Sequence, residues 1–158
     1  MRLLVEIMAE KDSLYDAMYY HKLQGFVYNL LRSTGYEKLH DKKSYKFFCF
    51  SNIFPSSQKK PINKGDIKHF IISSPDKMFI SITKDSLTKL IGENIGIGEM
   101  FFSMKGVKEI KPVLHDNCEI KTATPIIIRE HRKLLSFGID CGFGELNSMG
   151  FGFVNVVK

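Results

Sequence analysis

The sequence predicts an α+β fold whose first part has the element order β-α-β-β-α-β of a ferredoxin-like (RRM-like) unit. Three observations lead to this prediction: an alternating apolar strand at the N-terminus, a helical apolar stripe after it, and turn residues that divide the next segments into strands and a second helix. With 158 residues and 44% hydrophobic content, the chain can bury one solid core or two very small ones. A disordered chain is excluded.

The N-terminal segment is expected to form a strand followed by a helix. Leu3, Val5 and Ile7 alternate along residues 2–7, as in a strand with one buried face. The apolar residues that come next recur at i, i+3, i+4, i+7 and i+8, which is the pattern of a helix packed on a sheet. This stripe consists of Leu23, Phe26, Val27, Leu30 and Leu31. Gly35 is expected to end the helix.

The middle of the chain is expected to contribute three strands. Lys46 to Phe54 reads as the second strand, and the Pro- and Lys-rich residues 55–65 form an exposed loop. Ile67 to Ser73 and Met78 to Ile82 then pair across the turn at residues 74–77.

A second helix and a return strand complete this unit. Thr83 can cap a helix over Lys84 to Ile91, which Gly92 ends. Glu99 to Ile110 is expected to return as one long or bulged strand. A linker over residues 111–117 and two further strands follow, at Pro125 to Ile128 and at Phe151 to Val157.

Charge and cysteine content limit the classes of function. Lys plus Arg exceed Asp plus Glu by 23 to 17, and the resulting net charge of +6 favours a polyanionic partner, with a generic basic surface as the alternative. No apolar run approaches the ~20 residues that span a bilayer, so we expect a cytoplasmic protein without membrane contact. The widely spaced Cys49, Cys118 and Cys141 indicate reduced structural thiols, and no metal or other cofactor is implied.

Two Gly-Phe-Gly triplets lie near the C-terminus, in the segment 142–153 that we call the Gly-rich segment. Glycine permits positive φ and close approach of the backbone to a ligand, and successive N–H groups can then face a phosphate. The segment is therefore either an RNA-handling loop or an ordinary tight turn. Its place just before a terminal strand favours the RNA-handling loop.

This C-terminal arrangement resembles that of the CRISPR-associated endoribonucleases that cut precursor CRISPR RNA, members of the RAMP superfamily. A second stretch shares the resemblance: residues 23–29, then Leu39-His40-Asp41, then Lys46-Phe47-Phe48 have the order and spacing of that family's helix, catalytic histidine and second strand. The resemblance implies metal-independent cleavage, in which the ribose 2′-hydroxyl attacks its own phosphate and leaves a 2′,3′-cyclic phosphate. CRISPR repeat RNA would be the partner.

The resemblance also implies a set of site residues. The catalytic residues would be Tyr28 and His40 as the proton-transfer pair and Lys46 as the stabiliser of phosphate charge. The RNA-binding residues would be Lys42, Lys43, Gly142, Gly144, Asn147, Ser148, Gly150 and Gly152.

The residues themselves support part of this assignment. Tyr28 lies off the apolar stripe and shares a helix face with His21, Gln24 and Arg32, so its ring is not needed to fill the core; the alternative is an amphipathic residue at the core edge. His40 lies in a short polar connection, where its ordinary pKa near 6.5 suits proton transfer, although a lone loop histidine is more often a surface residue.

The chain departs from the family after residue 128, because only five residues separate the strand at Pro125 from the C-terminal motif. We expect a ferredoxin-like domain over residues 1–111 and a truncated second ferredoxin-like domain over 118–158. The family places a helix across residues 134–142, whereas their apolar alternation is that of a strand. The remnant must pack on the first domain or on another chain, as in a homodimer or a CRISPR effector complex. A non-catalytic RNA-binding or assembly subunit, or a deleted fragment without function, is the alternative to an active nuclease.

Overall fold

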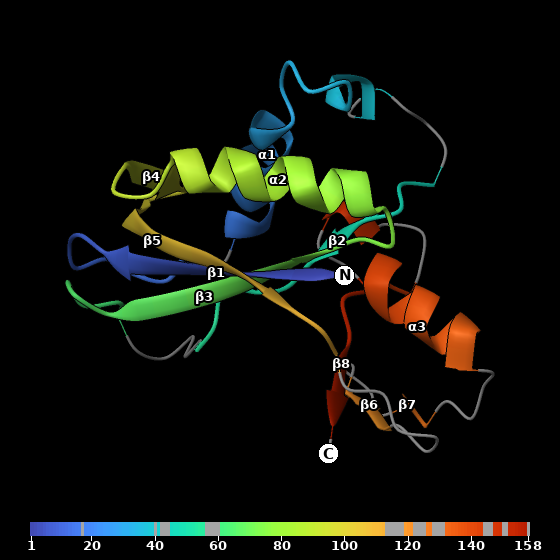
Figure 1. The fold of residues 1–158 in the computed structure, drawn as a ribbon. Helices are drawn as coiled ribbons and strands as arrows, with labels where there is room; N and C mark the ends of the chain where they lie inside the picture. Colours follow the sequence, from blue (N-terminus) through green and yellow to red (C-terminus); the bar gives the residue numbers. More distant parts are fainter. Residues whose placement is uncertain are drawn as a thin grey trace.

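The central strand of the main sheet is β1 (Arg2–Ala9), in which apolar side chains alternate as the sequence predicted. The computed structural model describes residues 1–16, 18–39, 41, 45–55, 61–112, 119–121, 126–127, 132–143, 147–149 and 152–157. In these residues the main sheet is antiparallel and five-stranded, with the order β2-β3-β1-β5-β4 (Figure 1). The other strands are β2 (Cys49–Phe50), β3 (Ile67–Ser73), β4 (Asn94–Ile97) and β5 (Met100–Ile110).

The register of β1 fixes which face of the sheet is buried. Val5 lies opposite Phe70 of β3 and Val107 of β5, and the side chains of Val5 and Phe70 are fully buried. The register against β5 shifts between Glu6 and Ile7, which confirms the bulged return strand that the sequence predicted.

Two helices cover the same face of this sheet (Figure 1). In α1 (Tyr19–Leu30), Leu23 and Val27 are fully buried, as the predicted apolar stripe requires. In α2 (Lys77–Lys89), Phe79 and Leu87 enter the same core. No helix in the described parts of the chain is long and apolar enough to cross a membrane.

The predicted strand at Met78 to Ile82 is wrong, because these residues form the first turns of α2. Asp76 caps the helix, since its carboxylate accepts hydrogen bonds from the backbone N–H groups of Met78 at 2.9 Å and Phe79 at 3.1 Å. Thr83 is not the cap: it lies buried in the helix interior, where its Oγ1 donates to the Phe79 carbonyl at 2.7 Å.

Two further differences concern strands. Of the predicted strand 46–54 only Cys49 and Phe50 belong to β2, with an isolated bridge between Phe54 and His69, because the chain turns where the Phe48 N–H donates to the Lys46 carbonyl at 2.8 Å. The sequence analysis missed β4, which pairs with β5 as a short hairpin. The available sequence signal was the alternation of Ile95 and Ile97, whose side chains are buried in the structure.

The C-terminal part forms a second antiparallel sheet in the described residues, with the order β7-β6-β8. Its strands are β6 (Glu119–Lys121), β7 (Ile126–Ile127) and β8 (Asn155–Val157). Between β7 and β8 lies α3 (Arg132–Cys141), so the segment whose apolar alternation suggested a strand is helical. Leu135 and Ile139, one turn apart, and Cys141 at its end are among its buried side chains.

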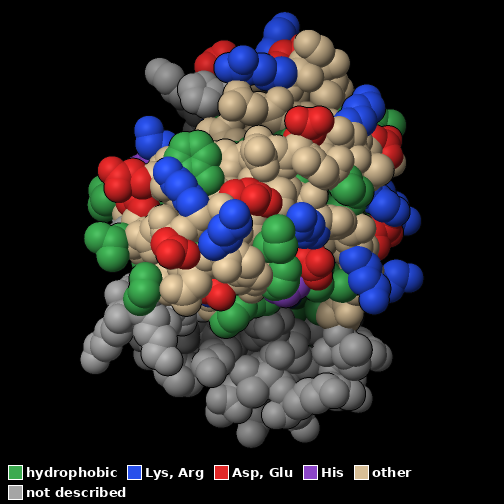
Figure 2. Space-filling view, turned by 90° about the vertical axis from the view of Figure 1, so that its left-hand side faces the viewer, with side chains coloured by type: hydrophobic (Ala, Val, Ile, Leu, Met, Phe, Trp, Pro, Cys, Tyr) green, Lys and Arg blue, Asp and Glu red, His purple; other side chains and the backbone are tan. Residues whose placement is uncertain are grey.

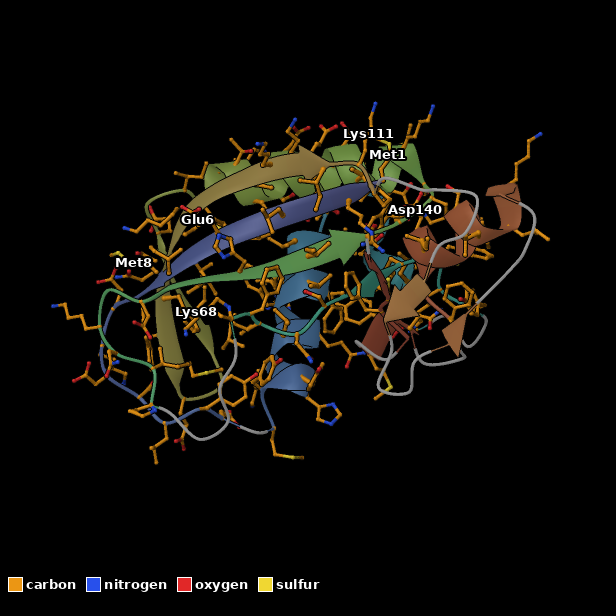
Figure 3. The ribbon with its side chains drawn as sticks, turned by 90° about the horizontal axis from the view of Figure 1, so that it is seen from below. Met1, Glu6, Met8, Lys68, Lys111 and Asp140 are labelled. Carbon is orange, nitrogen blue, oxygen red and sulfur yellow. The ribbon has the colours of Figure 1, made fainter. Side chains whose placement is uncertain are left out.

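A buried arginine joins the C-terminal part to the main sheet. The side chain of Arg2 is 1% exposed, and its Nη2 donates to the carbonyl oxygens of Ile139 at 2.9 Å and Val154 at 2.7 Å. Burial lowers the pKa of this guanidinium, whose carbon lies 4.8 Å from the centre of the Phe153 ring. Figure 3 shows Met1 and Asp140 next to each other at this junction. The C-terminal part thus packs within the chain, as one of the two predicted arrangements requires.

Candidate active site

The structure brings two of the three predicted catalytic residues together. Tyr28 lies in the third turn of α1, and its hydroxyl accepts a hydrogen bond from Lys46 Nζ at 3.0 Å. The same ammonium lies 5.3 Å from the centre of the tyrosine ring. Tyr28 and Lys46 are both half-buried, so a hydroxyl and a cation meet at the edge of the core.

The ring of Tyr28 packs against the core, whereas the sequence analysis expected that this ring is not needed to fill it. It contacts Phe48 edge-on, with ring centres 5.8 Å apart and an interplanar angle of 88°. Phe48 is buried in the main core. Tyr28 is therefore an amphipathic residue at the core edge, the alternative that was left open, and its hydroxyl still points to Lys46.

A pocket of about 420 Å³ opens beside Tyr28 along α1. Residues of α1 and the connection after it line the pocket: His21, Gln24, Gly25, Tyr28, Asn29, Arg32 and Glu37. The predicted shared face of His21, Gln24, Tyr28 and Arg32 is thereby confirmed. The pocket combines donors, acceptors and a guanidinium along one side of the helix.

Glu37 supplies a carboxylate at the rim of this pocket. It belongs to the short 3₁₀ helix η1 (Glu37–Leu39), and its Oε2 accepts a hydrogen bond from the Gly35 N–H at 2.7 Å. Backbone hydrogen bonds of Glu37 itself and of Gly35 lower the pKa of this carboxyl. The pocket rim therefore carries both a fixed negative charge and the positive charge of Arg32.

His40, Lys42 and Lys43 lie outside the described residues. On either side of His40 the backbone is hydrogen-bonded into η1, since the Leu39 N–H donates to Tyr36 at 3.0 Å and the Asp41 N–H donates to Lys38 at 3.2 Å. The catalytic role of His40 and the RNA contacts of Lys42 and Lys43 stay predictions.

The Gly-rich segment folds back on itself at the end of α3. The Gly142 N–H donates to the Gly138 carbonyl at 2.8 Å, and Gly142 takes a φ of +86°, as a glycine that ends a helix does. The Phe143 N–H donates to the Gly152 carbonyl at 2.9 Å, and Gly152 has a φ of +76°. A Cβ on Gly142 would lie 3.1 Å from the Cβ of Cys49, so this glycine allows close packing on β2. Gly144 and Gly150 lie outside the described residues.

The described interior of the Gly-rich segment packs on α1 and β2. The 3₁₀ helix η2 (Asn147–Met149) lies against β2 and α1. Asn147 is 1% exposed, and its Nδ2 donates to the hydroxyl of Tyr45, while the Ser148 carbonyl accepts from Gln24 Nε2 at 3.1 Å. These residues have a packing role in the chain without RNA, and their predicted contact with RNA stays a prediction.

The sequence analysis missed Tyr45. Its hydroxyl contacts Asn147 and Gly142 of the Gly-rich segment. Burial raises the pKa of the Tyr45 hydroxyl, and the interaction with Cys141 raises it further.

The neighbouring thiols Cys49 and Cys141 are free and buried, and burial raises the pKa of Cys49 to about 12. Cys118 lies outside the described residues. Within the described ranges, no three His, Cys, Asp or Glu side chains gather as a metal site would require.

Comparison with known sequences places the chain in a family. A family model described as CRISPR associated protein Cas6, C-terminal, matches residues 35–156. The chain belongs to the Cas6 family. A CRISPR-associated endoribonuclease Cas6 of Methanocaldococcus jannaschii, the second of that name, is 31% identical over 244 residues and is aligned over the full length of both chains. A CRISPR-associated endoribonuclease Cas6 of Haloferax mediterranei is 29% identical over 146 residues, which cover 89% of this chain and 52% of that protein.

The lengths of these Cas6 relatives differ from that of the chain. The alignment with the M. jannaschii protein is longer than the 158 residues of this chain, so residues of that relative have no counterpart here. The chain spans about half of the H. mediterranei protein.

Solved structures of a Cas6 protein and of related proteins share the fold. A CRISPR associated protein Cas6 superposes with a TM-score of 0.76 at 19% identity, covering 100% of this chain and 99% of that chain. A RAMP protein described as binding different RNA substrates gives a TM-score of 0.79 at 15% identity, with both chains fully covered. The product of a Cas6-related gene from Pyrococcus furiosus also gives 0.79, at 14% identity.

Proposed function

We propose that this Cas6 family member is an endoribonuclease that cuts CRISPR repeat RNA without a metal ion, by attack of the ribose 2′-hydroxyl on the adjacent phosphate. The observation that carries the proposal is the hydrogen bond of 3.0 Å between Lys46 Nζ and the Tyr28 hydroxyl beside an open pocket. The names of the two relatives, both CRISPR-associated endoribonucleases, support the same reaction class.

The residues divide the work of this reaction. One proton must leave the 2′-oxygen, another must reach the departing 5′-oxygen, and the phosphorane gathers negative charge between these steps. Tyr28 and His40 form the proton-transfer pair, and the ammonium of Lys46 stabilises the phosphorane. A phosphate seated at this pair would meet the hydroxyl and the ammonium at once, because their polar atoms are in direct contact.

The proposed organisation has a catalytic and a supporting part. Residues 1–111 would form a ferredoxin-like domain, since its strands β2, β3, β1 and β5 lie in that order and β4 is added at the edge. Residues 118–158 would be the shortened second domain.

The surface charge bears on where RNA would bind. Lys and Arg are interspersed with Asp and Glu over the described part of the face in Figure 2, so this face has no continuous positively charged patch that would attract RNA. The surface beside α1 and the Gly-rich segment is the proposed path.

The test is cleavage of a CRISPR repeat RNA by the purified protein in EDTA. We expect cleavage that leaves a 2′,3′-cyclic phosphate, because the nucleophile belongs to the substrate. A deoxyribose at the scissile nucleotide should abolish the reaction. Equal cleavage of that deoxy substrate, or a requirement for magnesium, would contradict attack by the 2′-hydroxyl.

A non-catalytic RNA-binding or assembly subunit is the second candidate. The unmatched residues of the longer M. jannaschii relative favour it, because a lost part of the second domain would remove RNA-binding surface while leaving the fold. This candidate predicts that the protein binds repeat RNA, or a CRISPR effector complex, and does not cut the RNA in EDTA or in magnesium.

A further inference from the structure

We infer that Tyr45 is a positioning residue for the proposed cleavage reaction, because it ties the Gly-rich segment to the backbone that presents Lys46. The inference rests on the proposed function. It gives the Gly-rich segment a task besides any contact with RNA, namely to hold the two catalytic elements at a fixed separation.

The first half of this arrangement lies next to Lys46. Tyr45 precedes it in the chain, and its half-buried hydroxyl donates to the Gly142 carbonyl at 3.2 Å and accepts from the buried amide of Asn147. The hydroxyl is also 3.7 Å from the Cys141 sulfur. One phenol therefore contacts both ends of the segment between α3 and η2, and fixes the backbone at position 45.

The second half lies on α1. Gln24 is one helical turn before Tyr28, and its side-chain amide donates to the Ser148 carbonyl at 3.1 Å. Ser148 follows Asn147 in η2, which packs against both β2 and α1. The same short helix thus holds the element that carries Tyr28 and the segment that carries Lys46.

The geometry of the catalytic pair depends on these two attachments. Lys46 lies in the chain segment 45–48, which contacts the C-terminal part through the hydrogen bonds of Tyr45 and through the ring of Phe47, whose centre lies 5.9 Å from that of Phe137. Loss of the Tyr45 hydroxyl leaves the buried Asn147 amide without this acceptor and lets the segment shift. A displacement of about 1 Å at a catalytic group can lower a rate about 10²-fold.

Tyr45→Phe is the test, since it removes one oxygen atom and keeps the ring. We expect its single-turnover rate at saturating repeat RNA to fall about 10-fold or more, with RNA affinity within about 3-fold of the unaltered protein. Tyr19→Phe is the matched control. Its hydroxyl also accepts a hydrogen bond from the Ile53 N–H at 3.1 Å and donates to Asn52 at 3.3 Å, but neither of these partners belongs to the Gly-rich segment. The control should lose stability and keep its rate.

A double-mutant cycle shows whether Tyr45 acts through Lys46. If it does, Tyr45→Phe should slow the Lys46→Ala variant far less than it slows the unaltered protein, because the group that it positions is already absent. Additive losses would overturn the inference. A second readout needs no cleavage: the ¹³Cζ resonance of Tyr28, assigned by its absence in Tyr28→Phe, should shift in Tyr45→Phe and stay in place in Tyr19→Phe.

The outcomes separate this inference from the proposed function. A slow Lys46→Ala variant together with a fully active Tyr45→Phe variant overturns the inference and leaves the proposed function intact. Failure of the unaltered protein to cut any repeat RNA overturns the proposed function. In that case the ¹³Cζ resonance of Tyr28 still tests the positioning role: a chemical shift in Tyr45→Phe equal to that in the unaltered protein overturns it.

Discussion

Replacement of Arg2 by Met is expected to release the C-terminal part from the main sheet. The guanidinium lies inside the protein and donates to two carbonyl groups that are 15 residues apart in the chain, those of Ile139 and Val154. Methionine fills much of the same volume and donates to neither. The two carbonyl oxygens would then remain buried without this donor.

The magnitude follows from these two bonds. Hydrogen bonds that involve a charged group contribute about 1.5–3 kcal/mol each, so the pair amounts to about 3–6 kcal/mol. The neutral side chain no longer carries the desolvation penalty of a buried cation, which offsets part of this loss. We therefore expect a net loss of about 2–4 kcal/mol, a large share of the about 5–15 kcal/mol that stabilises a typical domain.

Urea unfolding followed by circular dichroism measures the loss, and hydrogen exchange locates it. Amides of α3 should lose protection in Arg2→Met, while those of β1, β3 and β5 keep theirs. Lys84→Met is the control, since it breaks a half-exposed ion pair with Glu109 (2.7 Å) and should change stability little. Unaltered unfolding and exchange in Arg2→Met would refute the view that this arginine holds the C-terminal part in place.

Three further predictions concern the site and the fold. His40→Ala should lower the single-turnover rate by roughly 10²-fold with little change in RNA affinity, and Lys46→Ala should reduce both; an unchanged rate in His40→Ala would remove it from the mechanism. Gly152→Val should destabilise the protein in a thermal melt, because a Cβ there would collide with the Phe143 carbonyl and φ is +76°, and a melt like that of the unaltered protein would contradict this packing. Burial raises the pKa of Asp76, but hydrogen bonds from Tyr36 and two helix N–H groups outweigh this and lower it below 3.8. Asp76→Ala should therefore cost about 1 kcal/mol at neutral pH in urea unfolding, and this difference should vanish as the pH falls through the lowered pKa; a difference that persists in acid would exclude the carboxylate as its source.

Local periodicity predicted the parts of the fold that depend on neighbouring residues. The stripe of α1 and the alternation of β1 each follow from one element packing on one face, and both were found. The start of α2 was missed because the apolar run at residues 78–82 suits a strand as well as a helix. The deciding feature is the Asp76 cap, whose preference for a helix start the sequence does contain.

The site was predictable only where its residues carry a motif. Tyr28 and Lys46 were chosen from a resemblance, and the contact between them appears only when α1 lies beside the segment at residue 46. Tyr45 was missed since its role depends on Asn147, which lies 102 residues further along the chain. Spacing within a sequence does not reveal such a contact, because the fold alone brings the two side chains together.

The central place of β1 in the main sheet has a consequence for how the chain acquires its structure. The first strand to be synthesised has both of its neighbours far ahead, at residues 67–73 and 100–110, so it stays unpaired until β3 exists and is paired on both sides only once β5 exists. Such long-range pairing requires the closure of large loops and makes folding slow. During synthesis both edges of β1 stay open to other chains. We therefore expect the yield of folded protein to respond more strongly to translation rate and chaperone supply than that of a helical protein of equal size.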